Sequence, residues 1–384
     1  MIKKQINLGI DARSLAGSKK GVGQSLYNFL YAFSKSGKQM NIFLYSNKDF
    51  DLPGWASKFV KRIGSGPLSL NGTLWMQVVV PNLALEDKLD IFWGIEGILP
   101  LKLSDNIKQI ITINDLVSIF YPKTMGSWNL FVHALFFKRS LMKAKNIIVI
   151  SKQIKNELTR LFPEISHKLK LVYLGANVQI QPKDKTIARE YVANKFNIDS
   201  RFILFVGTLE PRKNLALLLK AARIMRTEHP SIDVKLVIVG AKGWKDSSFA
   251  GDLIKMEKEG LASALGYVSN EDLSYLYSAA SVFVLPSLYE GFGLPILEAM
   301  KCGAPLLLSD IPVFKEIAGD TAEYFDGNDG ISLAAKLFQL LNNPIDNDRK
   351  SEQINKFDWD RAAEDCLSLF IFSLEDKNKT EAIH

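Results

Sequence analysis

The stretch "LYEGFGLPILEAMKCGAP" at residues 288–305 determines how the rest of the sequence is interpreted. It follows "SVFVLPS" at 281–287, an apolar run rich in β-branched residues that is typical of a buried strand. Pro295 suits the first turn of a helix and Gly303 suits its end, so we expect a helix over about 295–302. The stretch therefore predicts a strand, a glycine-rich turn and a helix, which together form part of a βα unit.

The turn between this strand and helix is suited to an anion. Gly291 and Gly293 would let backbone amides approach a ligand, and amides at a helix start carry partial positive charge. Glu290 lies before the glycines and Glu298 about one turn into the helix. Carboxylates accept hydrogen bonds from the hydroxyls of a ribose or a sugar ring. The pattern predicts phosphate held by the backbone and sugar hydroxyls held by the two acids.

Short apolar runs alternate with helical patterns along the whole chain, which is typical of parallel βαβ units. One series begins at "INLGID" (6–11) and ends at "LKLVYLG" (169–175), and a second begins at "RFILFVGTL" (201–209). We expect an α/β fold of two Rossmann-like, doubly wound domains with an interdomain cleft, in which ligands bind beyond the carboxyl ends of the strands. The expected segments are an N-terminal domain over 1–178, a C-terminal domain over 179–356, and a final helix over 357–384 that packs back on the first domain.

The composition is that of a globular protein. The 384 residues are 47% hydrophobic and 23% charged, enough for about two domains. Two cysteines without a CxxC pair, Cys302 and Cys366, predict neither a disulfide scaffold nor a structural zinc site. The apolar run at the N-terminus is too short for a signal peptide, and no run approaches the ~18 residues of a membrane span. We expect a soluble or peripheral protein in the cytoplasm.

Charge is distributed unevenly along the chain. The net charge is +7, but residues 1–175 hold 24 Lys and Arg against 11 Asp and Glu, and residues 176–384 hold 24 against 30. A basic half suits nucleic acid, anionic lipid or a phosphate-bearing substrate. No helix-turn-helix, zinc-finger or RNA-binding aromatic pattern occurs, so we do not expect a nucleic-acid partner.

The segment "WNLFVHALFFKRSLMKAK" (128–145) combines apolar and basic residues at helical spacing. The apolar stripe consists of Trp128, Phe131, Leu135 and Phe136, and the basic residues are Lys138, Arg139, Lys143 and Lys145. One interpretation is a helix that lies on an anionic membrane surface. The other is an amphipathic helix that packs on the core and has a solvated basic end.

"EGFGLPILE" (290–298) resembles the E-x7-E motif of the retaining glycosyltransferases of the GT-B fold, in the family called group 1 or GT4. Further similar stretches follow the family order: "GVGQSLYNFL" (21–30), "TINDL" (112–116), "NIIVISKQIKNEL" (146–158), "FVGTLEPRKNLALLLKAA" (205–222) and "FDWDRAA" (357–363). The resemblance covers essentially the whole chain. It implies that a nucleotide-sugar donor binds the C-terminal domain and that an acceptor binds the N-terminal domain.

The segment "GTLEPRKN" (207–214) follows the first strand of the C-terminal domain, so Arg212 and Lys213 are expected at its carboxyl end. Two cations beside a pyrophosphate would stabilise the charge that develops on a leaving nucleoside diphosphate. The resemblance implies that this basic pair contacts the donor phosphates. Thr208 stands where the family often has an arginine.

Two further motifs belong to the N-terminal domain. Gly21 and Gly23 indicate a tight turn, and the resemblance implies that they approach the donor phosphates or the acceptor. Asn114 stands where many family members have a histidine that contacts the donor sugar. Asparagine hydrogen-bonds but does not titrate. Asp115 is a candidate for orienting the acceptor.

The candidate catalytic residues are Glu290, Lys213, Asp115 and Asn114. The candidate donor-binding residues are Arg212, Gly291, Phe292, Gly293, Leu294, Glu298, Thr208, Gly21 and Gly23. We expect no metal and no cofactor, because helix amides and the basic pair already supply positive charge. The two D-x-D triplets, Asp346 with Asp348 and Asp358 with Asp360, do not follow strands, and Asp358 is expected to cap a helix.

The resemblance implies a retaining transfer from a nucleotide sugar to a lipid-linked or saccharide acceptor in bacterial cell-surface polysaccharide biosynthesis. "TLEPRKN" resembles mannosyltransferase-like members, so GDP-mannose is the first donor to test. An anionic membrane surface on the inner face of the cell membrane is a further expected partner. Two alternatives remain: a non-catalytic nucleotide-sugar-binding partner of a polysaccharide assembly complex, to which Asn114 and Thr208 point, and a phosphorylase or sugar-nucleotide epimerase of similar fold.

Overall fold

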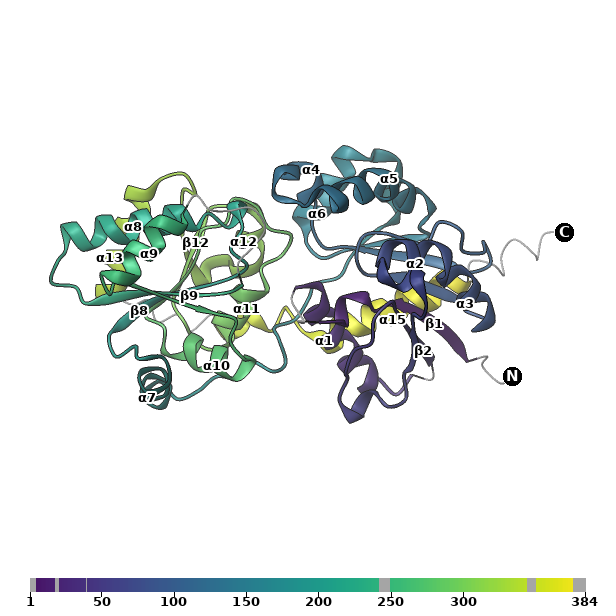
Figure 1. Cartoon of the computed structure of the whole chain (residues 1–384), viewed down its shortest axis with the longest axis horizontal. Helices are drawn as coiled ribbons and strands as arrows, with labels where there is room; N and C mark the ends of the chain where they lie inside the picture. The colour runs from purple at the N-terminus through teal and green to yellow at the C-terminus, as the bar shows by residue number, and fades with distance from the viewer. Residues whose placement is uncertain (1–4, 18–20, 39, 242–248, 344–349, 376–384) are drawn as a thin grey trace. The chain divides into compact units, whose positions relative to one another are not determined.

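The computed structural model describes residues 5–17, 21–38, 40–241, 249–343 and 350–375 of the chain (Figure 1). These residues form two compact units, each with its own parallel sheet. The first unit comprises Met1–Ser118, Ser127–Gly175 and Asp358–His384, and the second comprises Ile119–Gly126 and Ala176–Phe357.

The first unit is built on a sheet with the strand order β3-β2-β1-β4-β5-β6-β7, all pairs parallel. Its strands are β1 (Ile6–Asp11), β2 (Met40–Ser46), β3 (Val60–Ile63), β4 (Ile91–Gly94), β5 (Lys108–Ile113), β6 (Asn146–Val149) and β7 (Leu169–Leu171). Its helices are α1 (Val22–Lys35), α2 (Gly72–Val78), α3 (Val80–Glu86), α5 (Ser127–Lys143), α6 (Lys152–Leu161) and α15 (Trp359–Glu375), and α4 (Val117–Phe120) lies where the chain passes to the second unit. Short 3-10 turns are η1 (Arg13–Leu15), η2 (Gly54–Ala56), η3 (Pro67–Leu70) and η5 (Pro163–Lys168).

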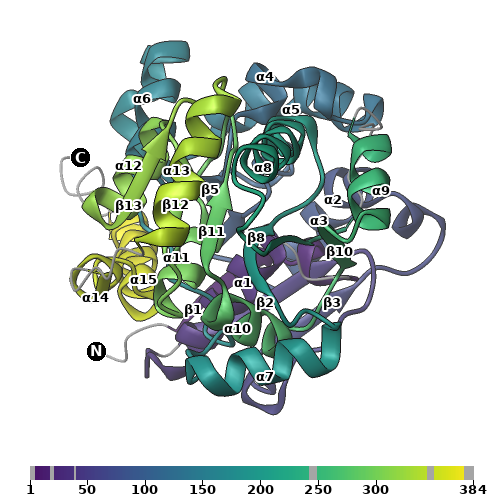
Figure 2. The same cartoon turned by 90° about the vertical axis from the view of Figure 1, so that its left-hand side faces the viewer.

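The second unit has the strand order β10-β9-β8-β11-β12-β13, again all parallel. Its strands are β8 (Arg201–Val206), β9 (Val234–Val239), β10 (Ala262–Gly266), β11 (Val282–Leu285), β12 (Leu306–Ser309) and β13 (Ala322–Phe325). Its helices are α7 (Lys185–Phe196), α8 (Leu215–Glu228), α9 (Ala250–Lys258), α10 (Asn270–Ala279), α11 (Leu294–Lys301), α12 (Pro312–Ala318), α13 (Gly330–Asn342) and α14 (Lys350–Ile354), with 3-10 turns η4 (Pro122–Thr124), η6 (Pro211–Lys213) and η7 (Gly319–Thr321). Helix α8 packs beside α13, and α7 beside α10 (Figure 2).

The α/β class with two Rossmann-like units is confirmed, but the units do not follow the expected boundaries. After the strands of the first unit, the chain enters the second unit at Gly175/Ala176 rather than after residue 178. It returns to the first unit at Phe357/Asp358 rather than after residue 356. Residues 119–126, expected in the N-terminal domain, belong to the second unit. There the rings of Phe120 and Tyr121 lie 5.5 and 5.6 Å from that of Tyr289. Such aromatic contacts between distant segments leave no local sequence signal.

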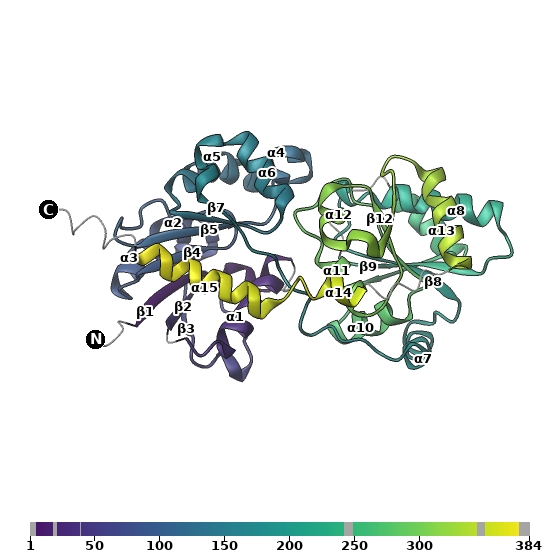
Figure 3. The same ribbon diagram turned by 180° about the vertical axis from the view of Figure 1, so that it is seen from behind.

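The terminal helix α15 packs within the first unit, alongside α1 (Figure 3). The ring of Trp359 lies 4.9 Å from that of Phe29, and Asn146 Nδ2 donates to Ser373 Oγ at 2.8 Å. A Cβ atom at Gly175 would lie 2.6 Å from Trp359 Cδ1, so a glycine is needed where the chain passes the indole. The helix is thus fixed by packing along its length.

Helix α5 packs on the core through a different face than the sequence analysis predicted. Its core contacts come from Val132, Phe137 and Leu141, which are buried, whereas Trp128 is 51% and Phe131 57% exposed. Leu135 is also exposed and Phe136 is half-buried. The helix therefore packs on the core and has a largely exposed basic end, but it does so through a different set of residues than the predicted stripe.

No helix among the described residues is long and apolar enough to cross a membrane.

Candidate functional site

The carboxyl ends of β8 and β11 bring two of the predicted motifs together. These strands are neighbours in the sheet and run parallel, so the segments that follow them leave at the same edge. Leu288 N donates to Arg212 O at 2.8 Å, which joins the two segments directly. Thr208 lies half-buried in the segment after β8.

Glu290 is buried at this edge, where it accepts hydrogen bonds from three side chains. Its Oε2 accepts from Arg212 Nη1 at 2.9 Å, and its Oε1 accepts from Ser287 Oγ at 2.8 Å and from Lys213 Nζ. Arg212 is held from two other directions, since its Nε donates to Glu210 Oε2 at 2.9 Å and its Nη1 to the Tyr289 carbonyl at 3.0 Å. The predicted catalytic acid and the predicted basic pair thus form one cluster.

The electrostatics of this cluster favour the ionised form of Glu290. Burial alone would raise the pKa of Glu290, but Lys213 and Arg212 outweigh it and lower the pKa to about 2. Burial lowers the pKa of Lys213, and the Glu290 carboxylate opposes that shift. With Glu210 included, two cations face two anions, so the cluster is close to neutral and its cations are held in fixed positions. Fixed cations of this kind stabilise negative charge on a ligand without reorganising.

Gly293 is the N-cap of α11, with φ of 121°. A Cβ atom there would lie 2.9 Å from Ile296 Cδ1, so the turn requires glycine. The helix starts at Leu294, one residue before the expected start, and ends at Lys301. Gly291 is buried and lacks a positive φ, and Leu294 is half-buried. The backbone at the start of α11 therefore follows the predicted strand–turn–helix geometry.

The side chain of Phe292 does not point to a ligand. It is 4% exposed, and its ring packs against that of Phe357 with the centroids 5.9 Å apart. Any contact of Phe292 with a donor would come from its backbone.

Glu298 is buried on α11, and its Oε2 accepts from the hydroxyl of Tyr277 on α10 at 2.9 Å. Burial raises its pKa to about 7, although the hydrogen bond from Tyr277 opposes the shift. The two glutamates of the motif thus differ in environment: Glu290 is surrounded by cations, and Glu298 is paired with a neutral hydroxyl.

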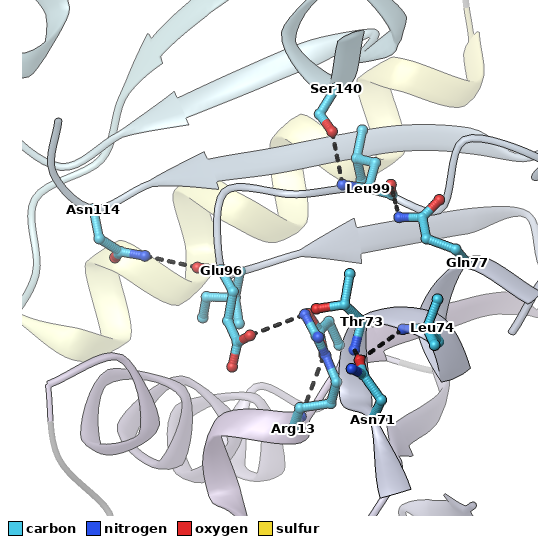
Figure 4. A network of polar contacts seen from close by, with 11 residues as sticks. Arg13, Asn71, Thr73, Leu74, Gln77, Glu96, Leu99, Asn114 and Ser140 are labelled. Carbon is cyan, nitrogen blue, oxygen red and sulfur yellow. Dashed lines mark hydrogen bonds and ion pairs between the residues drawn. The ribbon is translucent and has the colours of Figure 1, made fainter. Parts of the chain in front are cut away.

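The first unit places Asn114 and Asp115 directly after β5. Asn114 is half-buried, and its Nδ2 donates to the Ile95 carbonyl at 2.6 Å (Figure 4). Asp115 is exposed, and its Oδ1 accepts from the backbone N–H of Val117 at 3.0 Å. The amide nitrogen of Asn114 therefore holds the segment after β4, and its side-chain oxygen is the atom left for a ligand.

The two N-terminal glycines have separate structural reasons. Gly21, the N-cap of α1, has φ of 45°. A Cβ atom at Gly23 would lie 2.2 Å from the Ser14 carbonyl oxygen, so α1 packs on the η1 turn only with glycine there. A positive φ therefore accounts for Gly21, and close packing on the Ser14 carbonyl accounts for Gly23.

The structure adds residues that the sequence analysis missed. Asp11, the last residue of β1, is buried, and its carboxylate accepts hydrogen bonds from Nε and Nη2 of Arg13, each at 2.8 Å. Arg13 Nη2 also forms an ion pair with Glu96 Oε2 at 2.9 Å (Figure 4). The signal was an acid at the end of the first strand and an arginine two positions later. Glu96 carried no signal, because it lies 83 residues from Arg13 in the sequence.

A histidine lies near the ends of β4 and β5, although not at the family position. A Cβ atom at Gly97 would lie 3.9 Å from Cε1 of His133, which α5 supplies. Burial lowers the pKa of His133, and Asp115 opposes the shift.

The D-x-D triplets have separate outcomes. Asp358 caps α15, since its Oδ1 accepts from Arg361 N at 2.9 Å. Asp346 and Asp348 lie outside the described residues. Within the described chain, no group of three or more His, Cys, Asp or Glu side chains is placed to hold a metal ion.

Comparison with known proteins agrees with this geometry. Residues 188–357 match the family model described as glycosyl transferases group 1. The chain is 31% identical over 293 residues to the O-antigen chain mannosyltransferase B of Escherichia coli, which covers 75% of this chain and 76% of that protein. The chain belongs to the group 1 glycosyltransferases. A second relative in this family, the O-antigen chain mannosyltransferase RfbU of Salmonella typhimurium, is 26% identical over 66% of each chain.

Solved structures show the same fold as this group 1 glycosyltransferase. Sucrose-phosphate synthase from Thermosynechococcus elongatus superposes with a TM-score of 0.73 at 19% identity, over 96% of this chain and 98% of that one. WaaG, a glycosyltransferase involved in lipopolysaccharide biosynthesis, gives 0.69 at 16% identity, over 93% and 94%. The predicted family and GT-B fold are confirmed, and so is the prediction of a glycosyltransferase.

Proposed function

We propose that this glycosyltransferase moves mannose from GDP-mannose to a saccharide or lipid-linked acceptor in the assembly of a cell-surface polysaccharide, with retention of the anomeric configuration. The bond from the anomeric carbon to the GDP oxygen breaks, and a bond to an acceptor oxygen forms on the same face. The proton of the acceptor hydroxyl passes to the leaving phosphate. The mannosyltransferase names of the relatives support this donor.

The cluster of Arg212, Lys213 and Glu290 beside the start of α11 is the observation that carries the proposal. A diphosphate at this edge would meet two fixed cations and the amides of the helix N-terminus. As the phosphates take up the cations, Glu290 would become free to accept from hydroxyls of the sugar. Glu298 has a second oxygen to offer to a ribose hydroxyl. In this proposal the donor binds the second unit and the acceptor binds the first.

Metal independence is part of the proposal. Arg212, Lys213 and the helix amides supply the positive charge that a metal ion supplies in other transferases. Asn114 and Asp115 would contact the sugar or the acceptor hydroxyl through their side-chain oxygens.

We also propose that the first unit binds the anionic surface of the cell membrane, on the face of the membrane that lies toward the cytoplasm. The exposed rings of Trp128 and Phe131 share α5 with Lys138 and Arg139. Aromatic side chains insert at a lipid interface, and cations nearby bind anionic headgroups. A lipid-linked acceptor would be presented at such a surface.

Thermal unfolding with a panel of nucleotides tests the donor proposal. GDP and GDP-mannose should raise the midpoint, with or without EDTA, whereas UDP, ADP and dTDP should not, because a ligand that binds only the folded state stabilises it. Lys213→Ala should abolish the shift, and Lys220→Ala, on the exposed face of α8, is the matched control. The absence of a shift with every nucleotide would contradict the proposal. A shift without transfer or hydrolysis of GDP-mannose would favour the non-catalytic binding partner.

A further inference from the structure

The segment after β4 is fixed at three points within the first unit. Strands β1, β4 and β5 are neighbours and run parallel, so the residues that follow them lie at one edge of the sheet. Asn114 binds the carbonyl of Ile95, Arg13 binds the carboxylate of Glu96, and Gly97 has a φ of 76°. Glu96 is therefore presented from a rigid backbone.

The two carboxylates on Arg13 have different environments. Asp11 is 1% exposed, and both of its oxygens are bound by the guanidinium, so its role is to fix Arg13. Glu96 uses only Oε2 for Arg13, and 29% of its side chain is accessible. Among the described residues Oε1 of Glu96 has no hydrogen-bond partner, and Figure 4 shows its carboxylate reaching the arginine through one oxygen. Arg13 thus acts as a support that orients a carboxylate with one acceptor atom unused.

Stability does not account for this arrangement. Replacing a largely buried ion pair with apolar residues of similar size is often neutral for stability, so the fold gains little from Glu96 that an apolar residue would not supply. Burial raises the pKa of Glu96 to about 7 against the opposing effect of Arg13.

The charge of this edge selects the chemistry of its ligand. Among the described residues, the charged groups that act on Glu96 are the cation Arg13 and the anion Asp11. With Glu96 itself, two acids against one cation disfavour a phosphate at this point and favour an uncharged group with hydroxyls.

From these observations we infer that Glu96, oriented by Arg13, binds a hydroxyl of the uncharged sugar ring of the acceptor. The inference rests on the proposed transfer to a saccharide and names the residue that recognises the acceptor. Glu96 then sets the affinity for the acceptor and leaves the donor untouched, because Arg212, Lys213 and Glu290 belong to the other unit.

The test compares Glu96→Gln with wild type, using GDP-mannose as donor and octyl α-mannoside as acceptor. Gln keeps the size and one oxygen for Arg13 but loses the charge. The acceptor KM should rise about tenfold, the scale of one charge-assisted hydrogen bond. The donor KM and the hydrolysis of GDP-mannose without acceptor should stay within about twofold, a split that a merely structural role would not produce. Glu164→Gln, at an exposed position of the same unit, is the matched control.

Three results would overturn the inference in distinguishable ways. An unchanged acceptor KM in Glu96→Gln, with donor hydrolysis intact, would reject Glu96 while the proposed function stands. A parallel loss of donor hydrolysis and acceptor use in Glu96→Gln would show a general structural effect. Glu96→Asp, which keeps the negative charge beside Arg13, should then retain both activities. Wild-type enzyme that neither binds GDP nor hydrolyses GDP-mannose would reject the proposed function and this inference with it.

Discussion

Each of the two units has an arginine–carboxylate pair at the carboxyl edge of its parallel sheet, but the two carboxylates differ in exposure, in hydrogen-bond partners and in pKa. In the second unit the side chain of Glu290 is 10% exposed and accepts from Ser287, Arg212 and Lys213. In the first unit the side chain of Glu96 is 29% exposed, and Arg13 is the one partner it has among the described residues. The pKa is lowered to about 2 in the first case and raised to about 7 in the second.

The difference shows that the neighbouring charges, rather than burial alone, decide the pKa of a carboxylate. Burial raises the pKa of both groups, but Lys213 and Arg212 reverse this effect at Glu290, whereas at Glu96 the anion Asp11 adds to it and Arg13 opposes it. A carboxylate whose two oxygens already accept hydrogen bonds can bind a ligand that displaces those partners. A carboxylate with an unused oxygen is ready for a hydroxyl. This difference is the basis on which we propose that the second unit binds the charged donor and the first an uncharged part of the acceptor.

The largest expected effect is at Glu290. Glu290→Gln removes the anion between two buried cations, so we expect about 3 kcal/mol of lost stability and roughly a hundredfold or greater loss of turnover. Glu96→Gln should lose less than about 1 kcal/mol. Urea unfolding and steady-state kinetics measure both, and Glu228→Gln at the exposed end of α8 is the control. Equal losses of stability in the two variants would remove the contrast between the units.

A smaller, pH-dependent effect is expected at Glu298. The folded state holds its proton up to about pH 7, whereas an unfolded glutamate releases it near a pKa of about 4.3. Stability is therefore lost as pH rises through this interval. Glu298→Gln should gain on wild type by up to about 3 kcal/mol between pH 4.5 and pH 7.5, while its affinity for GDP falls. Glu271→Gln, at an exposed position of α10, should show no such trend in thermal melts.

The smallest expected effect concerns the exposed aromatic residues of α5 in the first unit. Trp128→Ala should lower binding to vesicles of phosphatidylcholine and phosphatidylglycerol about fivefold, because one exposed ring at the lipid interface is lost. Binding to phosphatidylcholine alone should be weak throughout, and the melting temperature should not change. Tyr267→Ala removes a ring that is 66% exposed on the second unit and serves as the control. Equal losses in both variants would show that α5 has no special role.

The elements of the fold could be read from the sequence because their signals are local. Apolar runs of strand length alternate with helical patterns, and Gly293, Pro295 and Gly303 mark the turn, the start and the end of α11. The basic pair at the end of β8 and the acid after β11 follow from their position behind a strand. What the sequence missed lies in contacts between distant residues: the packing of 119–126 against Tyr289, and the pairing of Arg13 with Glu96.

The sequence by itself determined the two-unit α/β architecture, the family and the residue types at the edge of the second sheet, because periodicity and backbone requirements act over a few residues. The tertiary structure decided which atoms those residues use. It turned Phe292 toward Phe357, placed Glu290 between two cations, and left the aromatic stripe of α5 exposed. Burial and charge depend on neighbours brought together by folding, so no local pattern encodes them.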